Sequence, residues 1–372
     1  MKLFIGLMSG TSMDGIDAAL VDVSTNTLIA GITRPYSDDV MRILQNVLSK
    51  EYSRVSELSQ LNTLLGREFS LAVFQLLDTA NIKPQSVVAI GSHGQTICHD
   101  AMAKIPYTMQ LACAHTIAEL TGIKVVADFR TRDLIIGGQG APFAPIYHQA
   151  LFGEHDSPLV VVNIGGVANV TYLEPGGRVS GYDVGPGNCL LDSWIKMHLD
   201  LDYDKDGAWA ASGAVIVPLL SALLDDPFFK CLPPKSIGKE YFSIDWLSNH
   251  LQPHYAPQDV QATLLALTAE AIAADIKIRH LAPQWVAICG GGVHNTALQN
   301  TLIKQLPNSQ VKSTKVLGVD PDFLEAMMFA WLADKALNLT PLNFRQITGA
   351  KHKTVYGAIY AAGIDKGNKT GV

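Results

Sequence analysis

A short polar turn near the start of the sequence carries residue types that bind phosphate. It interrupts the apolar run LFIGLMSGTSMDGIDAALVDV at residues 3 to 23 with two glycines, three hydroxyls and a carboxylate. Backbone N–H groups of such a turn can converge on an oxyanion, Thr11 and Ser12 add donors, and Asp14 suits a magnesium ion. The turn lacks the lysine of a P-loop. An ordinary hairpin turn at Asp14-Gly15 remains the alternative.

Two further glycine clusters follow apolar strands. The segment LVVVNIGGVANVTYL (159 to 173) contains Gly165 and Gly166, and WVAICGGGVHNTAL (285 to 298) contains Gly290, Gly291 and Gly292 before an expected helix start. Glycine lets a phosphate or a flat ring approach the backbone at a helix N-terminus. Tight packing of a strand against a helix would also explain three consecutive glycines, so both readings stay open.

A carboxylate stands beside a glycine-proline turn in SGYDVGPGNCLLDSW (180 to 194). Asp183 directly precedes this turn, and a helical pattern begins at Cys189 or Leu190. A carboxylate facing phosphate loops could act as a base toward an attacking oxygen. It could equally serve as a turn or helix-start residue.

Four more side chains are candidates for ligand contact. His93 and Thr96 lie in the donor-rich segment AIGSHGQTI, and Arg130 precedes a glycine-rich turn where it could hold a carboxylate or pair with Asp128 or Asp133. Asp320-Pro321 predicts the start of a helix that runs to about Ala336, with Glu325 about one turn inside it. There Glu325 either faces a cleft or stabilises the helix start.

Alternating apolar runs predict strands, and apolar spacings of three and four predict helices between them. The expected helices are 58 to 77, 260 to 278 and 320 to 336, and the expected strands are 3 to 8, 16 to 23, 86 to 91, 123 to 127, 159 to 164, 168 to 173 and 285 to 289. This mixture predicts an α/β protein. Because the segment from 159 to 173 repeats the opening design of strand, glycine turn and strand, we expect two related lobes that face each other across a cleft.

The chain has no flexible linker, so the boundary between the lobes must be a tight crossing. We place it near residue 130, with an N-terminal lobe at 1 to 130, a C-terminal lobe at 131 to 339, and a last segment from about 340 to 372 that can pack back on the first. Residues 225 to 257, which contain five prolines, predict an irregular insertion.

Composition restricts the partners and the compartment. A formal charge of -6 on 372 residues, with no basic run, argues against nucleic acid or an anionic membrane as partner. Five scattered cysteines without a CxxC pair argue against disulfides or a zinc cluster. No apolar stretch reaches the roughly 18 residues that span a bilayer. We therefore expect a cytoplasmic protein with small-molecule substrates.

Five segments together resemble one enzyme family. GLMSGTSMDGIDAALVD, GSHGQT, NIGGVANVT, DVGPGNCLLD and GGGVHN, spread in order from Phe4 to at least Ala361, are similar to the signature segments of the anhydro-N-acetylmuramic acid kinases. The resemblance implies the two-lobed fold of actin, hexokinase and Hsp70, which is ribonuclease H-like, with ATP in the cleft between the lobes. It also implies a homodimer and a role in recycling cell-wall sugars.

The resemblance also implies residue roles. Gly10, Thr11, Ser12, Met13, Asp14, Gly15, Ile16 and Asp17 would bind the ATP phosphates, with magnesium at Asp14. Gly165 and Gly166 would form a second phosphate hairpin, and the glycines from 290 to 292 would contact the nucleoside. Asp183 takes the place of the catalytic aspartate. His93, Thr96, Arg130 and Glu325 would line the sugar pocket.

The implied substrate requires an unusual reaction, because 1,6-anhydro-N-acetylmuramic acid has no free 6-hydroxyl. Water must open the internal acetal while O6 attacks the γ-phosphorus of ATP, and this gives N-acetylmuramic acid 6-phosphate and ADP. The alternatives are a kinase that acts on another, free sugar and a nucleotide switch like actin or a chaperone.

Overall fold

The computed structural model describes residues 1–10, 15–50, 52–153, 157–233, 235–238 and 241–363, and it divides into two compact units. Unit 1 comprises 1–140, 323–345 and 350–372, and unit 2 comprises 141–322 and 346–349. The division therefore falls ten residues after the expected boundary at 130. The helix expected at 320 to 336 also belongs with the first part of the chain, whereas the sequence assignment put it in the C-terminal lobe.

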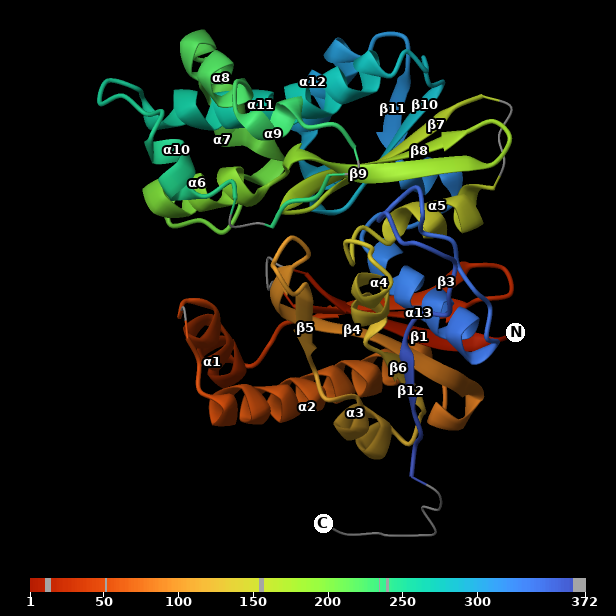
Figure 1. Cartoon of the computed structure of the whole chain (residues 1–372). Helices are drawn as coiled ribbons and strands as arrows, with labels where there is room; N and C mark the ends of the chain where they lie inside the picture. Colours follow the sequence, from red (N-terminus) through yellow and green to blue (C-terminus); the bar gives the residue numbers. More distant parts are fainter. Residues whose placement is uncertain (11–14, 51, 154–156, 234, 239–240, 364–372) are drawn as a thin grey trace. The chain divides into compact units, whose positions relative to one another are not determined.

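Unit 1 is a mixed sheet covered by helices (Figure 1). Its strands are β1 (Leu3–Ser9), β2 (Ile16–Asp22), β3 (Thr27–Arg34), β4 (Val87–Asp100), β5 (Tyr107–Leu111), β6 (Val125–Ala127) and β12 (Ala358–Tyr360). Its helices are α1 (Asp38–Leu48), α2 (Val55–Ala80), α3 (Ala114–Thr121), α4 (Phe129–Ile135) and α13 (Leu324–Leu337), with a 3₁₀ turn at Pro84–Ser86.

The strands of unit 1 follow the order β12-β6-β4-β1-β2-β3, and β5 pairs with β4. β1, β2 and β3 form an antiparallel meander, while β4 pairs with β1 and β6 in parallel. Alternate residues of a strand point to opposite faces, so Leu3, Ile5 and Leu7 lie in one core with the buried face of α2. Helix α13 packs on the other face.

Two glycines explain how α13 approaches the sheet so closely. A Cβ at Gly6 would lie 1.7 Å from the carbonyl oxygen of Ala326, and one at Gly91 would lie 1.9 Å from that of Phe329. The helix begins at Leu324, so the prediction of a start at Asp320-Pro321 was wrong. Asp320 instead accepts a hydrogen bond from the N–H of Asp322 at 3.0 Å, which makes a local turn before the helix.

Unit 2 contains a second sheet with its own helices (Figure 1). Its strands are β7 (Leu159–Ile164), β8 (Val167–Glu174), β9 (Arg178–Pro186), β10 (Trp285–Cys289) and β11 (Gln310–Ser313). Its helices are α5 (Ala144–Phe152), α6 (Cys189–Leu199), α7 (Ala208–Ser212), α8 (Val217–Leu224), α9 (Pro227–Lys230), α10 (Ile244–Ser248), α11 (Pro257–Ile278) and α12 (Thr296–Gln305); 3₁₀ turns occupy Lys205–Gly207, Gly291–His294 and Thr314–Leu317.

The second sheet repeats the first. Its order is β11-β10-β7-β8-β9, with an antiparallel meander from β7 to β9 and parallel pairs β7–β10 and β10–β11. In unit 1 the strands β6-β4-β1-β2-β3 follow the same order. This duplicated arrangement, an antiparallel meander followed by two parallel strands, confirms the predicted ribonuclease H-like α/β fold and the internal repeat.

Two local expectations need correction. Strand β4 does not end at residue 91 but continues to Asp100, because from Gln95 onward it pairs with β5. The segment from 225 to 257 is not wholly irregular, since it contains α9 and α10. Among the described residues no single helix could cross a membrane by length and hydropathy, and one bent pair, Lys205–Ser212 with Val217–Leu224, passes that test jointly.

Candidate functional site

The first glycine turn joins β1 to β2 in unit 1. Thr11, Ser12, Met13 and Asp14 lie outside the described residues, so their predicted contacts with phosphate and magnesium stay predictions. Of the flanking residues, Ile16 is fully buried in the core. Any contact of Ile16 with a nucleotide must therefore use its backbone. Asp17 is half-buried and accepts a hydrogen bond of 2.6 Å from the hydroxyl of Thr33.

A buried polar network braces both ends of this turn. The hydroxyl oxygen of Ser9 lies 2.9 Å from the carbonyl oxygen of Gly15 and 2.7 Å from Gln95 Oε1. The hydroxyl of Tyr36 donates to Ser9 at 2.8 Å, and Gln95 Nε2 donates to the carbonyl of Gly10 at 3.3 Å. None of these three bracing side chains was predicted as a functional residue, although Ser9 and Gln95 stand inside the motifs MSGTSMDG and SHGQT.

His93 and Arg130 form the centre of the predicted sugar-binding set. Arg130 Nε donates to His93 Nε2 at 2.8 Å, so Nε2 carries no proton and Nδ1 donates to the carbonyl of Gly94 at 2.9 Å. Burial, and then the charge of Arg130, hold the pKa of His93 well below its usual value. The histidine is therefore neutral. Arg130 Nη1 also donates to the carbonyl of Gly140 at 2.7 Å, which fixes the guanidinium.

Glu325 joins this set because α13 belongs to unit 1. It lies in the first turn of the helix and is partly exposed. Burial raises the pKa of Glu325, the charge of Arg130 opposes that shift, and Asp17 adds to it. Thr96 lies three residues beyond His93 on β4, and its hydroxyl accepts from Gln110 Nε2 at 3.3 Å. Unit 1 thus brings His93, Arg130 and Glu325 together.

The second glycine turn, between β7 and β8 in unit 2, is braced by backbone. The carbonyl of Gly165 accepts from the N–H of Asn188 at 2.8 Å, and the carbonyl of Gly166 accepts from Gly187 at 2.9 Å and from Cys189 at 3.1 Å. Within the described residues, the N–H groups of the two turn glycines have no protein acceptor. These amides are therefore available to an oxyanion, as a phosphate hairpin requires.

Packing explains two of the three consecutive glycines. A Cβ at Gly290 would lie 2.4 Å from Asn163 Oδ1, and one at Gly292 would lie 2.5 Å from Ile164 Cβ, so tight packing against β7 explains both. A Cβ at Gly291 would meet only Asn188 Nδ2, at 3.7 Å. The next α-helix starts at Thr296, and Asn295 caps it by accepting a hydrogen bond from the N–H of Leu298. Gly291 is thus the glycine that packing leaves unexplained.

Asp183 lies on β9, and backbone groups of Lys235 and Ile237, in the segment PPKSIGKEYF (233 to 242), hold it in place. The N–H of Ile237 donates to Asp183 Oδ2 at 2.9 Å, and the N–H of Asp183 donates to the carbonyl of Lys235 at 3.1 Å. Only 9% of Asp183 is exposed. Burial lowers the pKa of Lys235, and the charges of Asp275, Cys231 and Asp183 oppose that shift. Lys239, the other lysine of this segment, lies outside the described residues.

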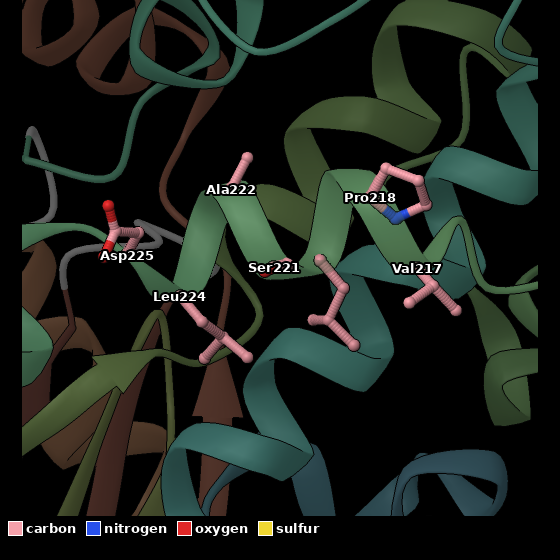
Figure 2. A pocket seen from close by; sticks show the side chains of 7 residues that line it. Val217, Pro218, Ser221, Ala222, Leu224 and Asp225 are labelled. Carbon is pink, nitrogen blue, oxygen red and sulfur yellow. The ribbon is translucent and has the colours of Figure 1, made fainter.

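An open hollow of about 580 Å³ lies elsewhere in unit 2, along α8 (Figure 2). Its lining is mostly apolar and consists of Val217, Pro218, Leu220, Ser221, Ala222, Leu224 and Asp225. Asp225, its one ionisable residue, accepts from Lys230 Nζ at 2.6 Å. The hollow therefore offers neither a positioned base nor a phosphate cradle.

The chain is similar over nearly its whole length to one protein family. The family model described as anhydro-N-acetylmuramic acid kinase matches residues 2–362. Relatives of that name include one from Legionella pneumophila (strain Lens), which is 56% identical over 360 residues that cover 97% of this chain and 98% of the relative. Another, from Xylella fastidiosa (strain Temecula1), is 44% identical over 367 residues that cover 97% and 96%.

Among solved structures, the chain has a weak likeness to the activator of the 2-hydroxyisocaproyl-CoA dehydratase from Clostridium difficile with bound ADPNP. The identity is 14%, the TM-score is 0.47, and the match covers 90% of this chain and 96% of that one. This likeness is too low to support an inference, so the fold assignment depends on the strand order of each unit.

Proposed function

This chain belongs to the anhydro-N-acetylmuramic acid kinase family, and we propose from that premise which of its residues carry out each part of the reaction. It is an ATP-dependent kinase that opens 1,6-anhydro-N-acetylmuramic acid with water and phosphorylates O6, in the recycling of murein sugars. The names of its relatives give no support to a kinase of another sugar or to a nucleotide switch.

We assign the water-activating base to Asp183. The observation that supports this role most directly is the hydrogen bond of 2.9 Å from the N–H of Ile237 to Asp183 Oδ2. It orients a nearly buried carboxylate, and this carboxylate lies on the same sheet as the Gly165-Gly166 turn. Asp183 takes one proton from water as the water oxygen bonds to C1 and the C1–O6 bond breaks. O6 then forms its bond to the γ-phosphorus, and ADP departs.

Phosphate binding is assigned to the two glycine turns. The amides of Gly165 and Gly166 and those of the turn from Gly10 to Gly15 would neutralise charge on the transferring phosphoryl group. Magnesium fits this region because acidic residues there offer oxygen ligands: the predicted ligand Asp14 in the turn and Asp17, held by Thr33, at the start of β2. When bound, the ion supplies positive charge to the phosphates. Gly291 is our assignment for contact with the nucleoside.

Sugar binding is assigned to His93, Thr96, Arg130 and Glu325 in unit 1. The guanidinium of Arg130 is fixed by His93 and Gly140, so it is preorganised to hold the lactyl carboxylate of the sugar. We also propose that the protein acts in the cytoplasm and forms a homodimer, as the family resemblance implies. Sedimentation of the purified chain would test the dimer.

The decisive experiment is a mass-resolved assay with ATP, magnesium and the anhydro sugar in oxygen-18 water. The product should be N-acetylmuramic acid 6-phosphate with one heavy oxygen at C1 and none in the phosphate. Unlabelled product kept in the same water corrects for exchange at the reducing carbon. A product without label at C1 would exclude the hydrolytic step, and label in free phosphate would reveal hydrolysis of ATP instead.

A second test removes the base. Asp183→Asn should bind ATP and sugar yet lose turnover by at least roughly a hundredfold, because an amide cannot accept the proton of the attacking water. Turnover close to that of the wild type would remove Asp183 from its assigned role.

A further inference from the structure

Asn169 on β8 carries a buried oxygen with no partner. Its side-chain carbonyl, Oδ1, is inaccessible to solvent and accepts no hydrogen bond from any part of the chain that the structure describes. An acceptor buried without a donor costs stability, so such a group in a native protein requires an explanation. One explanation is that a ligand or a water molecule donates a hydrogen bond to this oxygen during the reaction.

The strand register places this oxygen beside the proposed base. Asn169 pairs directly with Asp183 on β9. Side chains of directly opposed residues lie on the same face of a sheet. The N–H of Asp183 bonds to the carbonyl of Lys235 rather than to β8, so this pair is of the type without mutual hydrogen bonds, in which the Cα atoms are only about 4.5 Å apart. The register shifts between Ala168 and Asn169, as occurs where a sheet re-aims a side chain.

Asn163, Asn169 and Asp183 lie side by side on three neighbouring strands, and Asn163 is already engaged in packing. Asn163 on β7 pairs with Asn169 on its other side. Asn163 Oδ1 lies 3.8 Å from Cys289 Sγ and is close to the backbone at Gly290. Of the two asparagines, the one with the unsatisfied side-chain oxygen is therefore Asn169, which lies next to the carboxylate of Asp183.

We propose that Asn169 Oδ1 accepts a hydrogen bond from the second O–H of the attacking water, while Asp183 removes the proton of the first. This inference rests on the function proposed above. A water held by two acceptors has its lone pair directed away from both, toward C1 of the sugar. The amide oxygen is too weak a base to remove its proton, so that proton stays on the new C1 hydroxyl. The proton taken by Asp183 passes to solvent after ADP and the sugar phosphate have formed.

The test replaces Asn169 with leucine, which has nearly the same shape and no acceptor. Asn169→Leu should lower kcat at least about tenfold, the scale of a lost positioning contact. The KM values for ATP and for the anhydro sugar should stay within about twofold, because the lost contact is to water rather than to either substrate. The Tm should be unchanged or raised, since the variant removes an unsatisfied buried acceptor.

Thr171→Val is the matched control on the same strand. Thr171 is also buried, but its hydroxyl has a partner, His148 Nδ1, at 2.8 Å. This variant should lower the Tm and leave kcat unchanged. If Asn169→Leu does not fold, Asn169→Ser takes its place, with kcat expressed per mole of bound nucleotide. The serine hydroxyl is too short to reach the same water, so the same loss is expected.

Three outcomes would overturn the assignment: wild-type kcat in either folded variant, a rise in KM alone, or a loss of kcat that merely follows a Tm drop like that of Thr171→Val. Failure of the proposed function itself looks different, because the wild-type protein would then form no N-acetylmuramic acid 6-phosphate.

Discussion

The two units share a strand order but brace their first turns by different means. In unit 1 the turn from Gly10 to Gly15 depends on side chains, with Ser9, Gln95 and Tyr36 at its two ends. In unit 2 the Gly165-Gly166 turn depends on its own carbonyls, which accept from the backbone of residues 187 to 189. The same topology therefore supports two turns whose sensitivity to substitution should differ.

This difference shows where each unit is vulnerable. A side-chain brace fails when an acceptor or donor is removed, whereas a backbone brace fails when a Cβ separates the two backbones. The first kind of failure costs a hydrogen bond, and the second displaces main chain. Substitutions in the two units test this comparison directly.

The largest effect is expected from Gly187→Ala in unit 2. The added Cβ would lie 2.2 Å from the carbonyl oxygen of Gly165, so the two backbones must separate. We expect a loss of about 3 kcal/mol in the free energy of unfolding, at the upper end for overpacking, together with a raised KM for ATP. Urea unfolding and steady-state kinetics would measure both. Wild-type stability would contradict the backbone brace.

Ser9→Ala should break the brace of unit 1 at a smaller cost. The substitution removes the hydroxyl that links Tyr36, Gln95 and the carbonyl of Gly15, and it should cost about 2 kcal/mol. Use of Mg-ATP should weaken in parallel, because the Gly15 end of the turn loses its anchor and Gln95, which holds the Gly10 end, loses its contact with Ser9. Ser59→Ala, at an exposed helix hydroxyl, is the control and should change stability by less than about 0.5 kcal/mol. Equal stabilities of the two variants would refute the network.

Among the residues that the structure describes, each unit also buries one histidine, His93 in unit 1 and His148 in unit 2, which predicts a pH dependence. Burial lowers the pKa of His148 in unit 2 to about 3, and burial and Arg130 lower that of His93 in unit 1. Below pH 6.5 the unfolded chain binds these protons and the folded chain does not, so stability is present at neutral pH and is lost as the pH falls. Each histidine should contribute about 1.4 kcal/mol per pH unit.

The two histidines can be separated by substitution. His148→Gln and His93→Gln should each flatten the slope of unfolding free energy between pH 6.5 and 5, as measured by urea unfolding at each pH. Only His93→Gln should also raise the KM for the sugar, because His93 orients Arg130. A slope as steep as that of the wild type in both variants would show that these histidines are not the source.

The smallest effect is expected from Gly291→Ala. Its Cβ would meet only Asn188 Nδ2, at an ordinary contact distance of 3.7 Å, so stability should not change. If the nucleoside passes this glycine, the KM for ATP should rise about threefold, less than 1 kcal/mol of binding. An unchanged KM would remove Gly291 from the nucleotide site and leave the triple glycine explained by packing alone.

Sequence patterns predicted some elements of this protein correctly and others not. The apolar spacing in residues 58 to 77 predicted a helix, which the structure contains as α2. The repeated pattern of strand, glycine turn and strand predicted an internal repeat, which the two sheets confirm. The start of α13 was mispredicted because Asp320 makes a local turn rather than a cap. The role of Lys235 and Ile237 was not predictable, because their backbone contacts with Asp183 join residues more than 50 positions apart.

The sequence by itself determined the element types, the duplicated design and the family, since these depend on local periodicity and on contiguous motifs. Only the tertiary structure decided that α13 joins unit 1 and brings Glu325 to Arg130. It also decided which glycines serve packing and that Asn169 lies beside Asp183. The physical reason is that strand register and close backbone approach depend on residues distant in the chain, and no local pattern encodes which distant partner a residue will meet.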